Sequence, residues 1–283
     1  MAIDYDRLMK FPAKEQEITY SKRDTMLYAL GVGLGFDPLD EGQLRYVYEK
    51  DLVALPTIAM AIGHPGWWLG DAGLESGKVV HGEKRMEVIA PMPIEGTVVT
   101  KSIVTGATDK GPGKGALIHT QRDIWDKKTG KHLSRQINTM FARGQGGFGG
   151  HVGPVKVPHP MPTRAPDQIC ELPTMPQQAL IFRLSGDYHP LHAEPGFAKA
   201  NGFPRPILHG LANMAIATHA VLRAVCGYDS ARIKAVECRF TSPTFPGDKI
   251  VTEIWQDGKN VSFRSKVPAR NVTTVDHGLV ELT

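Results

Sequence analysis

The sequence predicts an α+β fold built from two similar halves in tandem, each a curved antiparallel sheet wrapped around a helix. Three observations predict it: a short internal repeat, a series of extended segments after each copy, and a long apolar segment ahead of the second copy. The chain has 283 residues, of which 41% are hydrophobic and 22% charged. It is therefore long enough to bury a sizeable core, or to form two domains of common size.

The internal repeat links residues 86–100, MEVIAPMPIEGTVVT, with residues 238–252, CRFTSPTFPGDKIVT. Both stretches run from an extended segment through two prolines and a glycine to an apolar pair closed by threonine, and Pro91 corresponds to Pro243. A match this short also arises by chance, so the segments around each copy have to support it.

Each copy is followed by extended segments separated by turns, which is the pattern of an antiparallel meander. The segments are 97–105, 116–126 and 132–141 in the first half, and 249–256, 260–267 and 272–282 in the second. Both halves are therefore expected to end in a meander.

The segment 206–227, PILHGLANMAIATHAVLRAVCG, is apolar on nearly every side, which is typical of a buried helix. Pro206 suits its first turn and Gly227 its C-cap. A buried helix followed by a meander that must cover it has the architecture of a hot-dog fold. We therefore expect two hot-dog units.

The first half has a shorter apolar counterpart at 52–70, which we also expect to be helical. A separate helix is expected within 20–33, where Ser21 and Asp24 are spaced as in a capping box.

The two halves are joined by a stretch rich in glycine and proline, RGQGGFGGHVGPVKVPHPMP. We place the N-terminal half at 1–142, the linker at 143–162 and the C-terminal half at 163–283. The linker lacks the consensus of a phosphate-binding loop, so its glycines do not indicate a nucleotide site.

Charge and cysteine content exclude several classes of protein. The net charge is +4 and the pI about 8.9, but the basic residues are scattered, which argues against a nucleic-acid or membrane partner. The three cysteines are odd in number and form no C-x-x-C pair, so neither a disulfide framework nor a zinc site is expected. With no apolar signal segment at the start, we expect a cytoplasmic location.

A candidate site lies in SGDYHPLHAEP, residues 185–195, where an acid and two histidines surround a proline. Asp187 and His192 can meet only if the backbone bends between them, and Pro190 imposes such a bend by restricting itself and His189. Gly186, beside Asp187, permits the close approach that a tight site needs. Taken alone, the same residues also fit a solvent-facing polar corner.

The start of the buried helix supports a site. His209 and Gly210 stand where a helix N-terminus offers free backbone N–H groups and a positive dipole end, which stabilise an oxyanion. An acid/base pair beside an oxyanion site is suited to proton chemistry next to a thioester carbonyl.

The stretch FRLSGDYHPLH, ending at His192, resembles the signature of the (R)-specific enoyl-CoA hydratases, the hydratase 2 or MaoC-like dehydratase family. The resemblance extends over almost the whole chain through DTMLYALGVG, VVHGEKRMEV, GQGGFGG and ILHGLANMA. Over this length the chain is similar to the double hot-dog hydratase 2 unit of peroxisomal multifunctional enzyme type 2.

The resemblance implies syn addition of water to trans-2-enoyl-CoA, with Asp187 and His192 as the catalytic dyad and the Gly210 N–H as oxyanion donor. It places ligand contacts on the following residues: His81, Gly82, Lys110, Tyr188, Pro190, Leu191 and Phe240. It implies an acyl-CoA substrate, no metal, no cofactor beyond the CoA of the substrate, and self-association, for which we expect a homodimer.

The chain departs from the family at one position, where His189 replaces an asparagine. Neutral histidine can donate and accept as asparagine does, but a protonated His189 would disfavour proton uptake by His192. The sequence leaves open which dyad member is the base. It also leaves open a thioesterase, or a non-catalytic CoA-binding subunit, on the same fold.

The first half has no counterpart of the dyad. Its GHPGWWLGD stretch contains Trp67 and Trp68, which we interpret as core or tunnel lining. Its interrupted helix could leave space for a bulky acyl chain.

Overall fold

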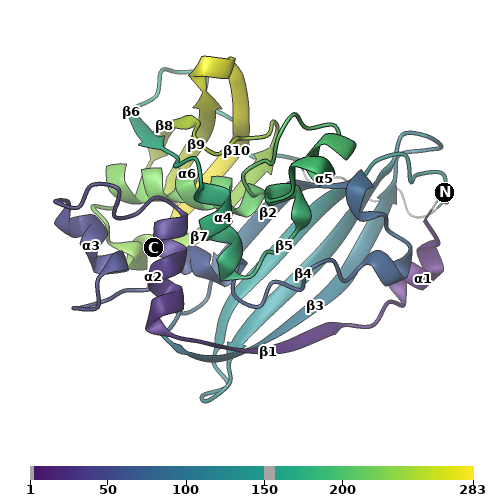
Figure 1. Cartoon of the computed structure of the whole chain (residues 1–283), viewed down its shortest axis with the longest axis horizontal. Helices are drawn as coiled ribbons and strands as arrows, with labels where there is room; N and C mark the ends of the chain where they lie inside the picture. Colours follow the sequence, from purple (N-terminus) through teal and green to yellow (C-terminus); the bar gives the residue numbers. More distant parts are fainter. Residues whose placement is uncertain (1–2, 150–156) are drawn as a thin grey trace.

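The computed structural model describes residues 3–149 and 157–283. Within them a single antiparallel sheet of ten strands has the order β1-β3-β4-β5-β2-β7-β10-β9-β8-β6 (Figure 1). The strands are β1 (Lys14–Tyr20), β2 (Val79–Val88), β3 (Gly96–Asp109), β4 (Ala116–Asp126), β5 (His132–Ala142), β6 (Gln168–Pro173), β7 (Ile233–Phe240), β8 (Lys249–Asp257), β9 (Asn260–Val267) and β10 (Val272–Leu282). The predicted α+β class is confirmed.

The internal repeat is real, because both halves contribute five strands in the same order. The repeated prolines lie between β2 and β3 in the first half and between β7 and β8 in the second, and the repeated glycine is the first residue of β3 or lies just before β8. Both meanders form as predicted, but the edge strands β1 and β6 were missed. The predicted linker lies partly at 150–156, outside the described residues, and the domain boundaries stay predictions.

The two halves are joined by antiparallel pairing of β2 with β7, from Glu83 opposite Arg239 to Glu87 opposite Ala235. On this seam the Arg85 guanidinium donates to the carboxylates of Glu237, at 3.0 Å, and Glu281, at 2.8 Å. The inner faces of both half-sheets therefore border one shared space.

The helix of the second half is α6 (Gly210–Ala224), and nearly all its side chains are buried. It packs against β6, β9 and β10 and contributes to a core shared by both halves. The helix begins at Gly210 with His209 as the N-cap, which agrees with the predicted start at these two residues. The placement of Pro206 in the first turn was wrong, because Pro206 precedes the helix. The predicted C-cap was also wrong, since the helix ends at Ala224 and Gly227 lies beyond the capping residue.

The prediction of a helix over 52–70 was wrong. That segment forms only a short 3₁₀ helix, η1 (Pro56–Met60), followed by a turn in which Gly63 has φ +66°. The buried Arg122 side chain holds this turn by donating to the carbonyls of Ala59 (2.8 Å), Met60 (2.7 Å) and Gly63 (2.9 Å). A guanidinium thus satisfies carbonyl groups that a longer helix would have bonded internally.

The remaining α-helices lie around the sheet (Figure 1). They are α1 (Tyr5–Met9), α2 (Lys22–Gly31), α3 (Glu41–Val47), α4 (Gln178–Phe182) and α5 (Pro195–Ala200). The capping box predicted at Ser21 and Asp24 is present at the start of α2. Within the described ranges, no helix combines the length and apolar character needed to cross a membrane.

Arg122→Met should destabilise the fold strongly. The substitution removes the Arg122 donors to the Met60 and Gly63 carbonyls, while Gln136 still donates to Ala59. We therefore expect the free energy of unfolding to fall by about 3 kcal/mol. Arg23→Met is the matched control, because the Arg23 side chain is 86% exposed, and should change it by less than about 0.5 kcal/mol. Urea unfolding followed by circular dichroism measures the free energy of unfolding of both variants. Equal effects would contradict the role of Arg122 in holding the turn after η1.

Candidate active site

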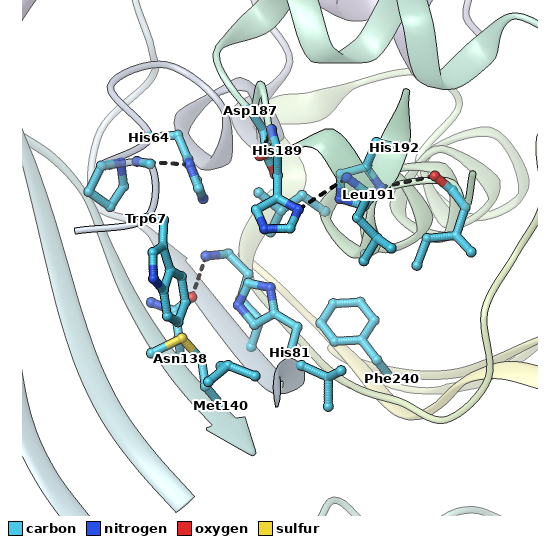
Figure 2. A pocket seen from close by; sticks show the side chains of 18 of the residues that line it. His64, Trp67, His81, Asn138, Met140, Asp187, His189, Leu191, His192 and Phe240 are labelled. Atoms are coloured by element: carbon cyan, nitrogen blue, oxygen red, sulfur yellow. Dashed lines mark hydrogen bonds between the residues drawn. The ribbon is translucent and has the colours of Figure 1, made fainter. Parts of the chain in front are cut away.

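A cavity of about 740 Å³ lies between the halves, within the size range of ligand pockets. Its second-half wall consists of residues 186–192 with the start of α6 and the end of β7, and its first-half wall includes His64 and His81 (Figure 2). The motif chosen from the sequence is therefore part of a cavity wall.

The bend at Pro190 brings the motif together. His189 is extended, as its position before proline predicts, and a short 3₁₀ turn, η5 (Pro190–His192), follows it. The His189 N–H donates to the Asp187 carboxylate at 3.3 Å, and the Leu191 N–H donates to Nδ1 of His189, also at 3.3 Å. At Gly186, φ is +132° and a Cβ would lie 2.6 Å from the carbonyl oxygen of Ala61, so only glycine fits.

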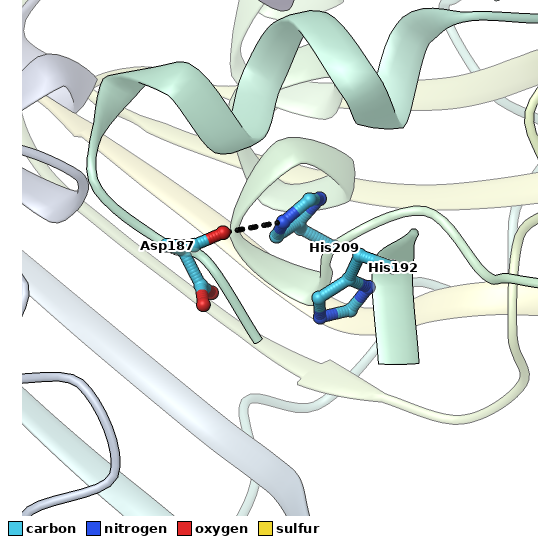
Figure 3. Close-up of side chains that lie close together, drawn as sticks. All are labelled: Asp187, His192 and His209. Carbon is cyan, nitrogen blue, oxygen red and sulfur yellow. Dashed lines mark hydrogen bonds between the residues drawn. The ribbon is translucent and has the colours of Figure 1, made fainter. Parts of the chain in front are cut away.

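The hydrogen bond of His192 fixes its tautomer. Nδ1 lies 2.9 Å from the carbonyl oxygen of Ile207, and because a carbonyl only accepts, Nδ1 carries the proton. In the neutral ring, Nε2 is then an acceptor. Asp187, His192 and His209 each offer an atom within 4.8 Å of the other two (Figure 3).

His209 contacts both Asp187 and His192. Its Nε2 donates to the backbone carbonyl of Asp187 at 3.1 Å, and its ring stacks on that of His192 with centroids 3.6 Å apart. The side chain of the N-cap residue of α6 therefore fixes the backbone of Asp187 and the ring plane of His192.

The local electrostatics favour ionised Asp187 beside neutral histidines. Burial raises the pKa of Asp187, but the imidazoles of His64, His209 and His192 and the N–H of His189 outweigh burial and lower it. Burial lowers the pKa of His192, although Asp187 and the Ile207 carbonyl oppose that shift. Burial likewise lowers the pKa of His189, against the opposing effect of Asp187.

Asp187, His192 and His209 could each offer one ligand atom to a metal ion. Each imidazole, however, already donates one ring N–H to a backbone carbonyl, and the two rings lie at 23° to each other. The free lone pairs of stacked rings lie in nearly parallel planes and do not converge on one ion. This donor set fits acid/base chemistry better than metal binding.

Gly210 is the first residue of α6, where a backbone N–H has no partner within the helix, and it lines the cavity. The ring of Phe240 lies beside it, and His81 packs on Phe240 with ring centroids 5.5 Å apart. The seam between β2 and β7 thus brings the first-half residue His81 close to the start of α6.

The structure brings most of the predicted site residues to the cavity wall. They are His81, Asp187, Tyr188, His189, Pro190, Leu191, His192, Gly210 and Phe240, together with Trp67 and Trp68. Gly82, in a bulge of β2, and Lys110, after β3, are not among the described residues that line it. Their contacts with ligand stay predictions.

Sequence reasoning missed several first-half side chains that line the cavity, among them His64, Lys84, Arg122 and Asn138. Three of these four lie on strands where inward positions are usually apolar. The available signal was this alternation, because polar residues occupy the inward positions of β4 and β5.

In comparisons with known proteins, two protein families match the chain, one in each half. The family described as MFE-2 hydratase 2 N-terminal domain matches residues 18–144, and the family described as MaoC like domain matches residues 158–277.

Similar proteins cover nearly the whole chain. An Arabidopsis thaliana protein named enoyl-CoA hydratase 2, peroxisomal, is 36% identical over 95% of this chain and 93% of its own length. The crystal structure of a MaoC-like dehydratase from Phytophthora capsici superposes with a TM-score of 0.85 and 32% identity, covering 99% of this chain and 98% of that one. A Mycobacterium tuberculosis protein described as a double hot-dog fold is 13% identical with a TM-score of 0.60, covering 99% and 98% of the two chains, and supports the fold alone.

The buried histidines predict that acid destabilises the protein. Burial lowers the pKa of His64 to about 4 and those of His81 and His209 to about 3, from the ordinary histidine value of 6.5. Between pH 6.5 and 4 the unfolded chain binds more protons, so the free energy of unfolding falls as pH falls. His209→Asn should reduce this slope by up to about 1.4 kcal/mol per pH unit. Urea unfolding across the window measures it, and an unchanged slope would refute the assignment.

Proposed function

The chain belongs to the hydratase 2 family of MaoC-like hydro-lyases, and from that premise we propose that it is an (R)-specific 2-enoyl-CoA hydratase. It would add water reversibly to a trans-2-enoyl-CoA to give the (3R)-3-hydroxyacyl-CoA. The observation that carries the proposal is the pairing of two acceptors on one cavity wall, the Asp187 carboxylate and Nε2 of His192. A water molecule has two hydrogens to donate to such a pair.

The tautomer of His192 supports its role as the base. As the water oxygen bonds to C3, Nε2 takes one proton from the water, and the imidazolium then returns that proton to C2. Asp187 accepts a hydrogen bond from the second hydrogen of the water, which stays on the product hydroxyl. Its negative charge also stabilises the imidazolium. Because one group takes and returns the proton on one face of the double bond, the addition is syn.

The N-terminus of α6 supports the other half of the step. When the C3–O bond forms, the π electrons of the double bond move toward the thioester oxygen. The N–H of Gly210 and the positive end of the α6 dipole would stabilise this enolate-like oxyanion. Protonation at C2 then restores the carbonyl.

His189 fits a supporting role at the family's asparagine position. Its Nδ1 accepts the Leu191 N–H, so in the neutral ring the remaining proton is on Nε2. An asparagine Oδ1 can accept the same bond. Because burial lowers the pKa of His189, the ring stays neutral at neutral pH and does not oppose proton uptake by His192.

The proposed reaction needs no metal and no cofactor beyond the CoA of the substrate, because attack, protonation and oxyanion stabilisation are all assigned to this chain's residues. The homodimer and the cytoplasmic location stay predictions.

Asp187→Asn and His192→Gln should each lower kcat for crotonyl-CoA hydration by at least about 10²-fold, because the first removes the negative charge that stabilises the imidazolium and the second removes the basic nitrogen that takes the proton. The assay follows loss of the ultraviolet band of the conjugated enoyl thioester. Asp257→Asn, at a 64% exposed carboxylate, is the matched control and should match the wild type. Release of free CoA in place of hydration would indicate the alternative, a thioesterase.

His189→Asn should keep kcat/KM within about tenfold of the wild type, since the amide oxygen can replace Nδ1 as acceptor for Leu191. The acid limb of the pH profile should stay in place, because burial lowers the pKa of the histidine that is replaced. A pH–rate profile of both proteins measures this. A large upward shift in activity at low pH in the variant would show that His189 is charged.

A further inference from the structure

The first half presents a band of polar side chains to the cavity, one from each of its five strands. We name these residues the polar belt: Gln16 of β1, Lys84 of β2, Ser102 of β3, Thr120 of β4 and Asn138 of β5. Thr120, Asn138 and Lys84 stand in register on three adjacent strands. In Figure 2 Asn138 lies across the cavity from Asp187 and His189.

Lys84 is the centre of the belt and is 4% exposed. Its ammonium group donates to the amide oxygens of Gln136, at 2.9 Å, and Asn138, at 2.6 Å. Both acceptors are neutral, and an ammonium group has three N–H donors, so one donor is left for the cavity. Among the described residues, none forms an ion pair with Lys84. A buried cation without an anion is costly, which suggests that a ligand supplies one.

Arg122 does not relieve this imbalance. Its guanidinium shares the Gln136 oxygen with Lys84, at 2.8 Å, and its other bonds go to backbone carbonyls. The second cation therefore adds positive potential beside the first, and the hydrogen bonds of its Nη1 and Nη2 groups go to oxygen atoms of the protein. Burial, with a further contribution from Arg122, lowers the pKa of Lys84, and a carboxylate beside the ammonium group would raise it again.

Two further belt atoms are buried and without partners. They are the hydroxyl oxygen of Ser102, in a residue 3% exposed, and the side-chain oxygen of Gln16. Both residues line the cavity. Buried polar atoms are normally hydrogen-bonded, so the belt has bonding capacity that a ligand would satisfy.

We propose that the polar belt is a subsite for a carboxylate at the far end of the acyl group, so that the substrate is the monothioester of an unsaturated dicarboxylic acid. The inference rests on the proposed hydratase activity and specifies its substrate class. Lys84 would pair with the carboxylate and Ser102 would donate to it. The phosphates of CoA are separated from the thioester by the pantetheine arm, whereas the belt faces the dyad where the acyl carbons react.

The test measures binding of saturated thioesters, which cannot react, by titration calorimetry. Each dicarboxylic thioester is compared with the methyl-ended thioester of equal length: succinyl-CoA with butyryl-CoA, adipoyl-CoA with hexanoyl-CoA, suberoyl-CoA with octanoyl-CoA. For at least one pair, wild type should bind the carboxylate-ended thioester about tenfold more tightly, the effect of a charge-assisted bond. Lys84→Met should reduce this preference to below about twofold.

Lys234→Met, at an exposed lysine of β7, is the matched control and should keep the wild-type preference. Should Lys84→Met fail to fold by circular dichroism, Ser102→Ala removes one unpartnered hydroxyl and should lower the preference about threefold. Equal loss of affinity for free CoA and for both members of a pair would overturn the proposal, because Lys84 would then bind the CoA moiety.

A wild type that hydrates crotonyl-CoA but shows no preference in any pair overturns the subsite and leaves the hydratase assignment intact. A wild type that prefers the carboxylate-ended thioesters but hydrates none of the corresponding enoyl-CoAs supports the subsite and overturns the hydratase assignment.

Discussion

The antiparallel pairing of β2 with β7 is the constraint on which the site depends. It turns two half-sheets of identical strand order into one surface, so that the inner face of each half borders the same cavity. His81 and Lys84 on β2 thereby come close to Phe240 and to the start of α6. Neither half would form this cavity wall alone, since Asp187, His192 and Gly210 lie in the second half and the polar belt lies in the first.

The second half uses its helix for structure and chemistry at once. The same turn that ends the extended segment before α6 places His209 as the N-cap, and His209 holds both the backbone of Asp187 and the ring of His192. Backbone carbonyls then fix the proton of each imidazole on one known nitrogen. Preorganisation of this kind lowers the reorganisation needed when charge develops in the transition state.

The sequence predicted those parts of the fold that depend on local signals. The extended segments and turns predicted the meander strands, and the capping box predicted the start of α2. The bend at Pro190 predicted the conformation of the candidate-site motif. The edge strands β1 and β6 were missed because each is short and its pairing depends on partners far along the chain. The helix at 52–70 was wrong because apolarity alone does not distinguish a helix from a buried turn, and the interaction that decides it, Arg122 with three carbonyls, joins residues about sixty positions apart. His64 and Lys84 were missed for the same reason, since their place in the site follows from tertiary contacts.

The first half has the short helix η1 where a longer helix was predicted, and this explains why the polar belt borders the cavity. In the second half, α6 covers the inner face of the sheet with apolar side chains. In the first half only η1 occupies the equivalent position, so the inner face borders the cavity, and its strands carry polar residues where the repeat would otherwise require apolar ones. Burying Lys84 without an anion lowers the stability of the fold, and an apolar residue of similar volume would avoid that loss. A chain that keeps this lysine at the cavity wall is best explained by a bound state in which the lysine has an anionic partner.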